Sequence, residues 1–167
     1  MPVDQIENLP VGSDVIIDAN IFIYALSNHS PLCTAFLRRC ASEDLLGVTT
    51  VEVVNEVTHR LMLGEALAKG FVQKANASEL KKKPEAVKKL TDYWNFTSQI
   101  FGINVLILGL EVPRLYRAEP LRRARGMLTN DSMVLAALDE YGIGCLATAD
   151  GDFDQVPGIT VYKPGDI

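Results

Sequence analysis

The stretch Val15-Ile16-Ile17-Asp18 decides the fold class, because a run that is apolar on both faces is typical of a strand buried inside a parallel sheet. Further apolar runs recur along the chain, and segments with helical periodicity separate them. These further predicted strands are residues 45–48, 103–107, 144–148 and 159–162. Strands that alternate with helices predict a parallel sheet with helices on both faces, which is an α/β architecture.

The sequence also marks where helices begin and end. Asn20 can cap a first helix, and Pro31 suits the first turn of a second. Thr49 or Thr50 precedes a third helix that is predicted to end near Leu63. The remaining helical patterns cover residues 65–102, broken near residues 83–84, a stretch up to residue 125, interrupted at Pro120, and residues 129–141, stopped by Gly142.

The composition is that of an ordinary globular chain. Of the 167 residues, 48% are hydrophobic and 22% are charged, which excludes wholesale disorder. The length favours one domain, residues 1–167. The formal net charge of −5 argues against a protein that holds nucleic acid by bulk charge, but not against an enzyme that acts on nucleic acid through bound metal ions.

Features of secreted and membrane proteins are not found in the sequence. The three cysteines, Cys33, Cys40 and Cys145, contain no C-x-x-C and indicate neither a disulfide framework nor a zinc site. Residues 1–10 carry no apolar core of a signal peptide, and the longest apolar stretch, around residues 103–110, is too short to span a bilayer. We therefore expect a cytoplasmic protein with no membrane contact.

Two acids follow predicted strands directly. Asp18 ends the first strand and Asp150 follows the strand that contains Cys145. In open α/β sheets, ligands bind outside the carboxyl ends of the strands, so these two carboxylates are predicted to share a site. For either residue alone, an Asx turn or a helix cap is an equally good interpretation.

Helical spacing singles out a third acid and leaves a fourth open. Asp131 lies three, four and seven residues before the apolar stripe of its helix, so it heads the buried side. The alternative is an acid that merely favours the positive end of a helix. On the helix that follows Thr50, Glu56 flanks the apolar stripe, and a solvated pair with Arg60 is its alternative reading. Glu52 points almost opposite that stripe and is predicted to be solvated.

These residues belong to four motifs that occur in order along the chain. The motifs are Asp18-Ala-Asn20-Ile-Phe-Ile-Tyr24, Glu56 on the helix after Thr49-Thr50, Thr129-Asn-Asp131-Ser-Met-Val-Leu-Ala-Ala137, and Thr148-Ala-Asp150-Gly-Asp152-Phe153. From Val15 to about Val161, the chain resembles the PIN-domain nucleases, in particular the VapC-like toxin ribonucleases. The resemblance implies a three-layer α/β/α sandwich around a five-stranded parallel sheet, with a cluster of acids that binds Mg²⁺ or Mn²⁺.

The resemblance also assigns roles to individual residues. The acids that it implies as catalytic residues and metal ligands are Asp18, Glu56, Asp131 and Asp150. Asp152 is a further candidate for the last metal-binding position. Asn20 and Thr148 match the polar positions that support such a site.

By the same resemblance, the expected partners are an RNA substrate, a protein antitoxin and a second copy of the chain in a homodimer. The candidates for contacts with RNA phosphates are Arg117, Arg122, Arg123 and Arg125, together with Arg114. The lysines at 81–83 and 88–89 could also guide RNA, although a solvated helix face is the favoured interpretation. The sequence's own sign of a dimer is a set of apolar residues that look exposed on helices, with core packing as the alternative: Phe22, Tyr24, Tyr93, Trp94 and Phe96.

The expected chemistry is metal-assisted hydrolysis of RNA phosphodiester bonds. Oxygen ligands without His or Cys favour Mg²⁺ or Mn²⁺ over zinc. The sequence contains no nucleotide-binding glycine motif, and His29 and His59 lie outside the four motifs. One rival, an Asp-nucleophile phosphatase, would need a second acid two residues after Asp18, where this chain has Asn20. The other rival is a non-catalytic PIN-like module that binds RNA or protein.

Overall fold

The computed structural model describes residues 3–167. Met1 and Pro2 lie outside the described residues. They belong to the predicted 1–167 domain and to the segment 1–10, in which the sequence predicted no signal peptide. The strands are β1 (Val3–Gln5), β2 (Asp14–Ile17), β3 (Leu46–Thr50), β4 (Leu106–Leu108), β5 (Cys145–Ala147) and β6 (Thr160–Lys163). The α-helices are α1 (Ala19–Leu26), α2 (Pro31–Ala41), α3 (Val51–Ala68), α4 (Ala77–Leu80), α5 (Pro84–Val87), α6 (Asp92–Gln99), α7 (Val112–Arg125) and α8 (Thr129–Tyr141), with short 3-10 helices η1 (Ile6–Asn8), η2 (Ile100–Gly102) and η3 (Gly151–Phe153).

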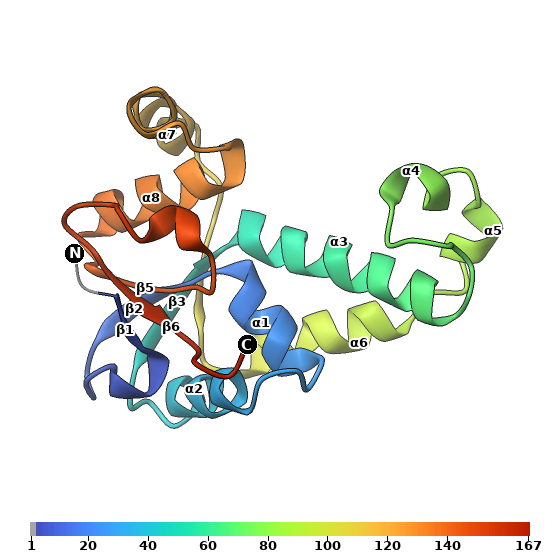
Figure 1. Ribbon diagram of the computed structural model, residues 1–167, viewed down its shortest axis with the longest axis horizontal. Coiled ribbons are helices and arrows are strands. Elements are labelled where there is room, and N and C mark those ends of the chain that lie inside the picture. The colour runs from blue at the N-terminus through green and yellow to red at the C-terminus, as the bar shows by residue number, and fades with distance from the viewer. Residues whose placement is uncertain (1–2) are drawn as a thin grey trace.

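The strands form one parallel sheet in the order β1-β6-β5-β2-β3-β4 (Figure 1). The predicted α/β fold with a parallel sheet is therefore confirmed. The sheet has six strands instead of the predicted five, because β1 pairs with β6 from Val3 opposite Val161 to Gln5 opposite Lys163. This three-residue edge strand is largely exposed and so lacks the apolar run by which the other strands were predicted.

Strand order explains how the helices are distributed over the sheet. From β2 the chain moves outward to β3 and β4, and it then returns to β5 on the other side of β2. Right-handed crossovers in opposite directions place their helices on opposite faces. Figure 1 accordingly shows α2 and α8 on opposite sides of the sheet. The main core lies between these layers and includes Ile16, Ile17, Phe22 and Leu135.

A second, smaller core lies away from the sheet. The distal half of α3 projects outward with α4, α5 and part of α6, which together form what we call the arm (Figure 1). Its buried residues are Ala66, Val72, Leu80 and Leu90. The helix α3 runs to Ala68, five residues past its predicted end, because its last turns have this second core to pack on.

Several predicted helix boundaries are confirmed and others are wrong. Within the segment 65–102, which was predicted to break only near residues 83–84, residues 69–76 and 88–91 are also not helical. Pro31 opens α2, Thr50 caps α3, and α8 ends at Gly142, whose φ of +64° suits glycine. Asn20 does not cap α1, because Asp18 accepts a hydrogen bond from the Ala19 N–H and so occupies the N-cap position. Pro120 does not interrupt α7, which continues from Val112 to Arg125.

Two expectations about the kind of chain can be compared with the described residues. Within residues 3–167, no helix combines the length and the apolar character that crossing a bilayer requires. Cys33, Cys40 and Cys145 are free thiols, of which Cys33 and Cys40 are buried.

Candidate active site

The predicted acids Asp18 and Asp150 lie where the strand order reverses. β2 and β5 are neighbours, paired at Ile17 and Ala147, and the chain leaves them toward opposite sides of the sheet. Such a reversal opens a crevice at the carboxyl ends of the strands, which is where open α/β sheets bind ligands. Asp18 follows β2 directly, and Asp150 follows β5 after Thr148 and Ala149.

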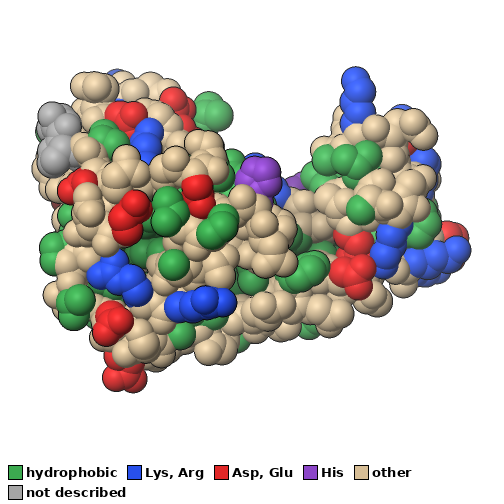
Figure 2. Space-filling model, turned by 60° about the horizontal axis from the view of Figure 1, so that its bottom comes forward, with side chains coloured by type: hydrophobic (Ala, Val, Ile, Leu, Met, Phe, Trp, Pro, Cys, Tyr) green, Lys and Arg blue, Asp and Glu red, His purple; other side chains and the backbone are tan. Residues whose placement is uncertain are grey.

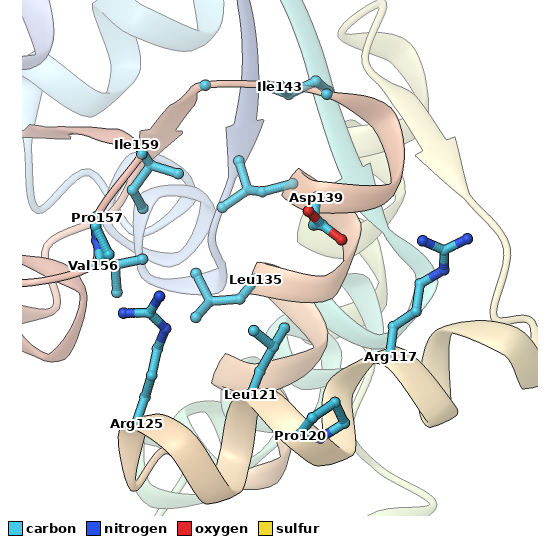
Figure 3. A pocket seen from close by; sticks show the side chains of 14 residues that line it. Arg117, Pro120, Leu121, Arg125, Leu135, Asp139, Ile143, Val156, Pro157 and Ile159 are labelled. Carbon is cyan, nitrogen blue, oxygen red and sulfur yellow. The ribbon is translucent and has the colours of Figure 1, made fainter.

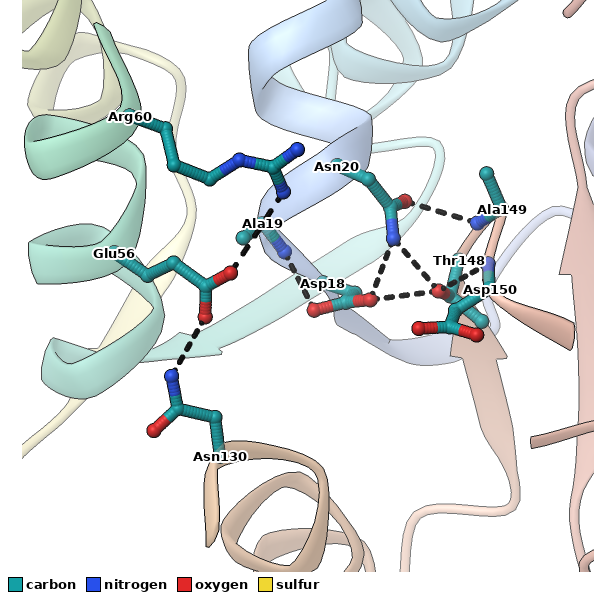
Figure 4. A network of polar contacts seen from close by, with 9 residues as sticks. All are labelled: Asp18, Ala19, Asn20, Glu56, Arg60, Asn130, Thr148, Ala149 and Asp150. Carbon is teal, nitrogen blue, oxygen red and sulfur yellow. Dashed lines mark hydrogen bonds and ion pairs between the residues drawn. The ribbon is translucent and has the colours of Figure 1, made fainter. Parts of the chain in front are cut away.

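A hydrogen-bond network fixes the Asp18 carboxylate (Figure 4). Its Oδ1 accepts a hydrogen bond from the Ala19 N–H at 2.7 Å. Its Oδ2 accepts from Asn20 Nδ2 at 2.7 Å and from Thr148 Oγ1 at 2.6 Å. Asn20 Oδ1 accepts from the Ala149 N–H at 2.9 Å, so Asn20 and Thr148 join the ends of β2 and β5 around Asp18.

Glu56 approaches this crevice from α3. Its Oε2 accepts a hydrogen bond from Asn130 Nδ2 at 2.9 Å, and its Oε1 lies 3.7 Å from Arg60 Nη1. The predicted pair with Arg60 is present, but Glu56 also lines a small hollow together with Asp18 and Asp131. Glu56 therefore forms the predicted pair with Arg60 and also faces the hollow that Asp18 and Asp131 line.

Asp131 lies in the first turn of α8, where burial and neighbouring acids act on it together. Burial is the largest cause that raises its pKa, to about 6, and the negative charges of four acids add to it: Asp150, Asp18, Asp152 and Glu56. Burial also raises the pKa of Asp18, against the hydrogen bonds from Thr148 and Ala19. The other four predicted acids thus lie close enough to influence the ionisation of Asp131.

Asp150 has a second, structural contact. Its Oδ1 accepts a hydrogen bond from the Asp152 N–H at 2.9 Å and so caps the short helix η3. Asp152 itself is exposed. The helix cap that was the alternative interpretation of Asp150 is therefore present. Asp150 also lies close enough to Asp18 for its charge to raise the pKa of Asp18.

One acid of the hollow was missed by the sequence argument. Glu52 was predicted to be solvated, but both of its carboxylate oxygens are buried and accept no hydrogen bond from a described residue. It lines the hollow with Asp18, Glu56 and Asp131. The volume of the hollow, about 10 Å³, is large enough for about one water molecule. The prediction failed because the Arg114 side chain from α7 and the first turn of α8 lie beside Glu52.

The donor set fits a hard divalent cation. It consists of carboxylate oxygens, which are the ligands that Mg²⁺ and Mn²⁺ prefer. Burial, the largest cause, and repulsion by the neighbouring acids together raise the pKa of Asp131, and a bound cation would offset the repulsion. Among residues 3–167, however, no three acidic, His or Cys side chains already come together as ligands of one ion. Of the predicted acids, Asp18, Glu56 and Asp131 line the small hollow, and Asp150 and Asp152 lie outside its lining.

The arginines on α7 fall into two groups. Arg114 is buried against Glu140, so its predicted contact with RNA phosphates is wrong. Arg117 and Arg125 line a larger hollow of about 580 Å³ between α7, α8 and the segment before β6 (Figure 3). Figure 3 shows apolar side chains between these two arginines, and none of the predicted acids lines this hollow. Arg122 is partly buried, and the exposed Arg123 lies 3.7 Å from Glu119.

The arm carries the lysines and two of the exposed aromatic residues of the sequence analysis. Figure 2 shows blue Lys and Arg side chains on the arm, across a hollow from the body. Lys83 and Lys88 pair with Glu79 and Glu85, which agrees with the favoured interpretation of a solvated face. The side chains predicted to look exposed differ: Trp94 and Phe96 are exposed, Tyr24 and Tyr93 are partly buried, and Phe22 is wholly buried in the main core.

Comparison with known proteins gives one family match. The model of the PIN domain family matches residues 15–159, a segment that contains all five predicted acids. No curated protein matches the chain in sequence.

Solved structures share the fold at low identity. VapBC2 from Rickettsia felis bound to promoter DNA aligns with a TM-score of 0.57 and 16% identity over 90% of this chain and 98% of that one. DNA-bound VapBC from Salmonella typhimurium aligns with a TM-score of 0.58 and 12% identity over 90% and 98%. VapC20 of Mycobacterium tuberculosis, described as a sarcin-ricin loop cleaving toxin, aligns with a TM-score of 0.55 and 14% identity over 87% and 96%. Likeness at this identity establishes a common fold.

Proposed function

The chain belongs to the PIN domain family, and from this premise we propose that it is a metal-dependent endoribonuclease, the toxin of a toxin–antitoxin pair. One observation carries the proposal. Acids that follow β2 and β5 gather with acids on α3 and α8 at the strand reversal, and burial together with the charges of the other four raises the pKa of Asp131. Perturbed acids in a crevice are typical of catalytic sites.

The proposed cation ligands are Asp18, Glu56, Asp131 and Asp150, with Asp152 as a further donor. A bound Mg²⁺ or Mn²⁺ would favour deprotonation of a water and offset the charge that develops on the departing oxygen. Asn20 and Thr148 orient the Asp18 carboxylate through their hydrogen bonds to Oδ2. Asn130 orients Glu56 in the same way.

The proposed track for RNA lies on α7, outside the small hollow that the acids line. The net charge of −5 requires that any attraction for phosphates be confined to a patch. We propose that Arg117, Arg122, Arg123 and Arg125 on α7 supply it, because α7 packs on α8, whose first turn holds Asp131. The rival function is a non-catalytic PIN-like binding module, which the absence of a ready-made ligand shell among the described residues would suit.

The remaining partners follow from family likeness. Several similar structures are described as toxin–antitoxin complexes or as DNA-bound VapBC. We propose that this chain, acting as one domain in the cytoplasm, binds a protein antitoxin and forms a homodimer, which light scattering can distinguish from a monomer.

The experiment that tests the function is cleavage of a panel of structured RNAs, with single-stranded DNA alongside. We expect the wild-type protein to cut RNA with Mg²⁺ or Mn²⁺ and to stop in EDTA. Asp131→Asn should cut about a hundredfold more slowly or worse, because loss of a cation ligand costs several kcal/mol at the transition state. Asp154→Asn, at an acid that pairs with Lys163 and does not line the hollow, is the control and should cut normally. Equal turnover by Asp131→Asn, with contaminating nuclease excluded, would reject the assignment.

A further inference from the structure

The Glu52 carboxylate is buried and has no hydrogen-bond donor among the described residues. It lies one helical turn before Glu56, in the first turn of α3. Its side chain is 18% exposed, but both oxygens are buried without a hydrogen bond from a described residue. Burying a charged carboxylate is costly unless another group compensates for the lost water. The groups around Glu52 should therefore reveal what that compensation is.

Arg114 provides one part of the compensation. Its side chain is 1% exposed, and its Nη1 lies 3.7 Å from Glu52 Oε1. The guanidinium directs its hydrogen bonds elsewhere: Nε donates to Glu140 Oε2 at 2.9 Å, and Nη1 donates to the Gly109 carbonyl oxygen at 3.0 Å. The Tyr141 ring centre lies 5.9 Å from the guanidinium carbon. One buried positive charge thus stands between two carboxylates, Glu52 and Glu140, which leaves the group with a net charge of −1.

Glu52 and Glu140 differ in what lies on their other side. Their exposed fractions are nearly equal, at 18% and 19%, and both pair with Arg114. Only Glu52 lines the small hollow that Asp18, Glu56 and Asp131 also line. The negative charge that Arg114 does not compensate therefore lies beside the small hollow that Asp18, Glu56 and Asp131 also line.

We propose that Glu52 is a further negative charge of the cation site, acting on the bound cation from beside its ligands, and that Arg114 is the positioning residue that holds Glu52 at the hollow. The inference rests on the proposed function, because it presumes that the other acids bind a divalent cation. Arg114 on α7 contacts Glu52 on α3 and Glu140 on α8, and it thereby connects α7 to the acidic crevice.

The test is calorimetric titration of Mn²⁺ into the metal-free full chain. Glu52→Gln keeps the shape of the side chain and removes its charge, so Mn²⁺ should bind about 10- to 100-fold more weakly, as is usual when a group beside metal ligands is lost. Glu140→Gln is the matched control, because it removes an equally buried partner of Arg114 that does not line the hollow, and it should bind Mn²⁺ as the wild type does. Glu52→Asp keeps the charge and should retain most of the affinity.

The outcomes separate the inference from the proposed function. If the wild type binds Mn²⁺ and Glu52→Gln binds it equally well, or if Glu140→Gln weakens binding as much, the inference is overturned while the proposed function stands. If the wild type binds no Mn²⁺, the proposed function fails first. The melting temperature of each metal-free variant verifies folding, and a role of Glu52 that is purely structural would lower that temperature without changing the affinity for Mn²⁺.

Discussion

At the scale of single residues, Asp131 shows how position decides what an acid does. A carboxylate in the first turn of a helix is ordinarily stabilising, because the positive end of the helix dipole favours its charge. In this fold the same position lies among four other acids and is partly buried, and the pKa rises to about 6. Burial and repulsion therefore outweigh the helix dipole at Asp131.

This shift predicts a dependence of stability on pH in the metal-free protein. Because the pKa of folded Asp131 is raised above its ordinary 3.8 to about 6, its contribution is most favourable below pH 3.8 and is lost as the pH rises through 6. Asp131→Asn removes that loss. In EDTA, the variant should melt above the wild type at pH 7.5, and the difference should vanish near pH 4. A variant that melts below the wild type at pH 7.5 would show that Asp131 is a stabilising first-turn acid instead.

The residues also show how far sequence reasoning could reach. Asp18 and Asp150 could be placed together because each follows a buried run, and parallel strands bring such positions to one edge. Glu52 could not, because its burial depends on Arg114, 62 positions later in the chain, whose side chain reaches back to α3. Helical spacing describes one helix and carries no information about which other helix covers its far side.

At the scale of elements, α3 connects the crevice to the arm. Its first turns carry Glu52 and Glu56, and its last turns carry Glu65. The Glu65 carboxylate accepts hydrogen bonds from the N–H groups of Thr91 and Tyr93, at 2.9 Å and 2.8 Å, and from Lys69. Burial opposes ionisation of Glu65, but these hydrogen bonds prevail and lower its pKa to about 2. Glu65 therefore holds the beginning of α6 against α3.

Glu65→Gln should accordingly loosen the arm. It removes a buried charge with three donors, so the free energy of unfolding should fall by about 2–3 kcal/mol in urea denaturation, with faster amide exchange at Thr91 and Tyr93. Because the pKa of folded Glu65 lies below its ordinary 4.5, the wild type should lose this stabilisation as the pH falls from 4.5 toward 2, and the variant should lose less. Glu85→Gln, at an exposed pair with Lys88, is the control and should change little. Unchanged amide exchange in Glu65→Gln would contradict the role of Glu65 as an anchor of α6.

The elements of the arm were the least predictable from sequence. Helical periodicity over residues 65–102 indicated helix, but it did not indicate that α3, α4, α5 and α6 would enclose a core of their own. In the same way, β1 was missed because a short exposed edge strand has no apolar pattern, whereas β2 and β5 were predicted because burial on both faces leaves one. The strands that are buried on both faces, and the acids that follow them, could be predicted because each such strand carries its own apolar run in the sequence.

At the scale of the whole molecule, negative charge is concentrated at one edge of the sheet. The chain carries five more acidic than basic residues, and several acids converge at the reversal of strand order instead of spreading over the surface. Such convergence costs stability unless a cation offsets it. Binding to the folded state alone stabilises a protein by RT ln(1 + [L]/Kd), about 2.7 kcal/mol at a hundredfold excess over Kd. For a chain of this length that corresponds to about 5–10 °C in melting temperature.

The most direct test of the central claim, that these acids form one divalent-cation site, is therefore the melting temperature with Mn²⁺ and with EDTA. We expect Mn²⁺ to raise the melting temperature of the wild type and EDTA to reverse the rise. Asp150→Asn should melt above the metal-free wild type, because one repelling charge is gone, and should respond less to Mn²⁺. Asp154→Asn, whose carboxylate pairs with Lys163 away from the hollow, should respond to Mn²⁺ as the wild type does. If millimolar Mn²⁺ leaves the wild type unchanged and Asp150→Asn destabilises the metal-free protein, the acids are structural caps and the claim is contradicted.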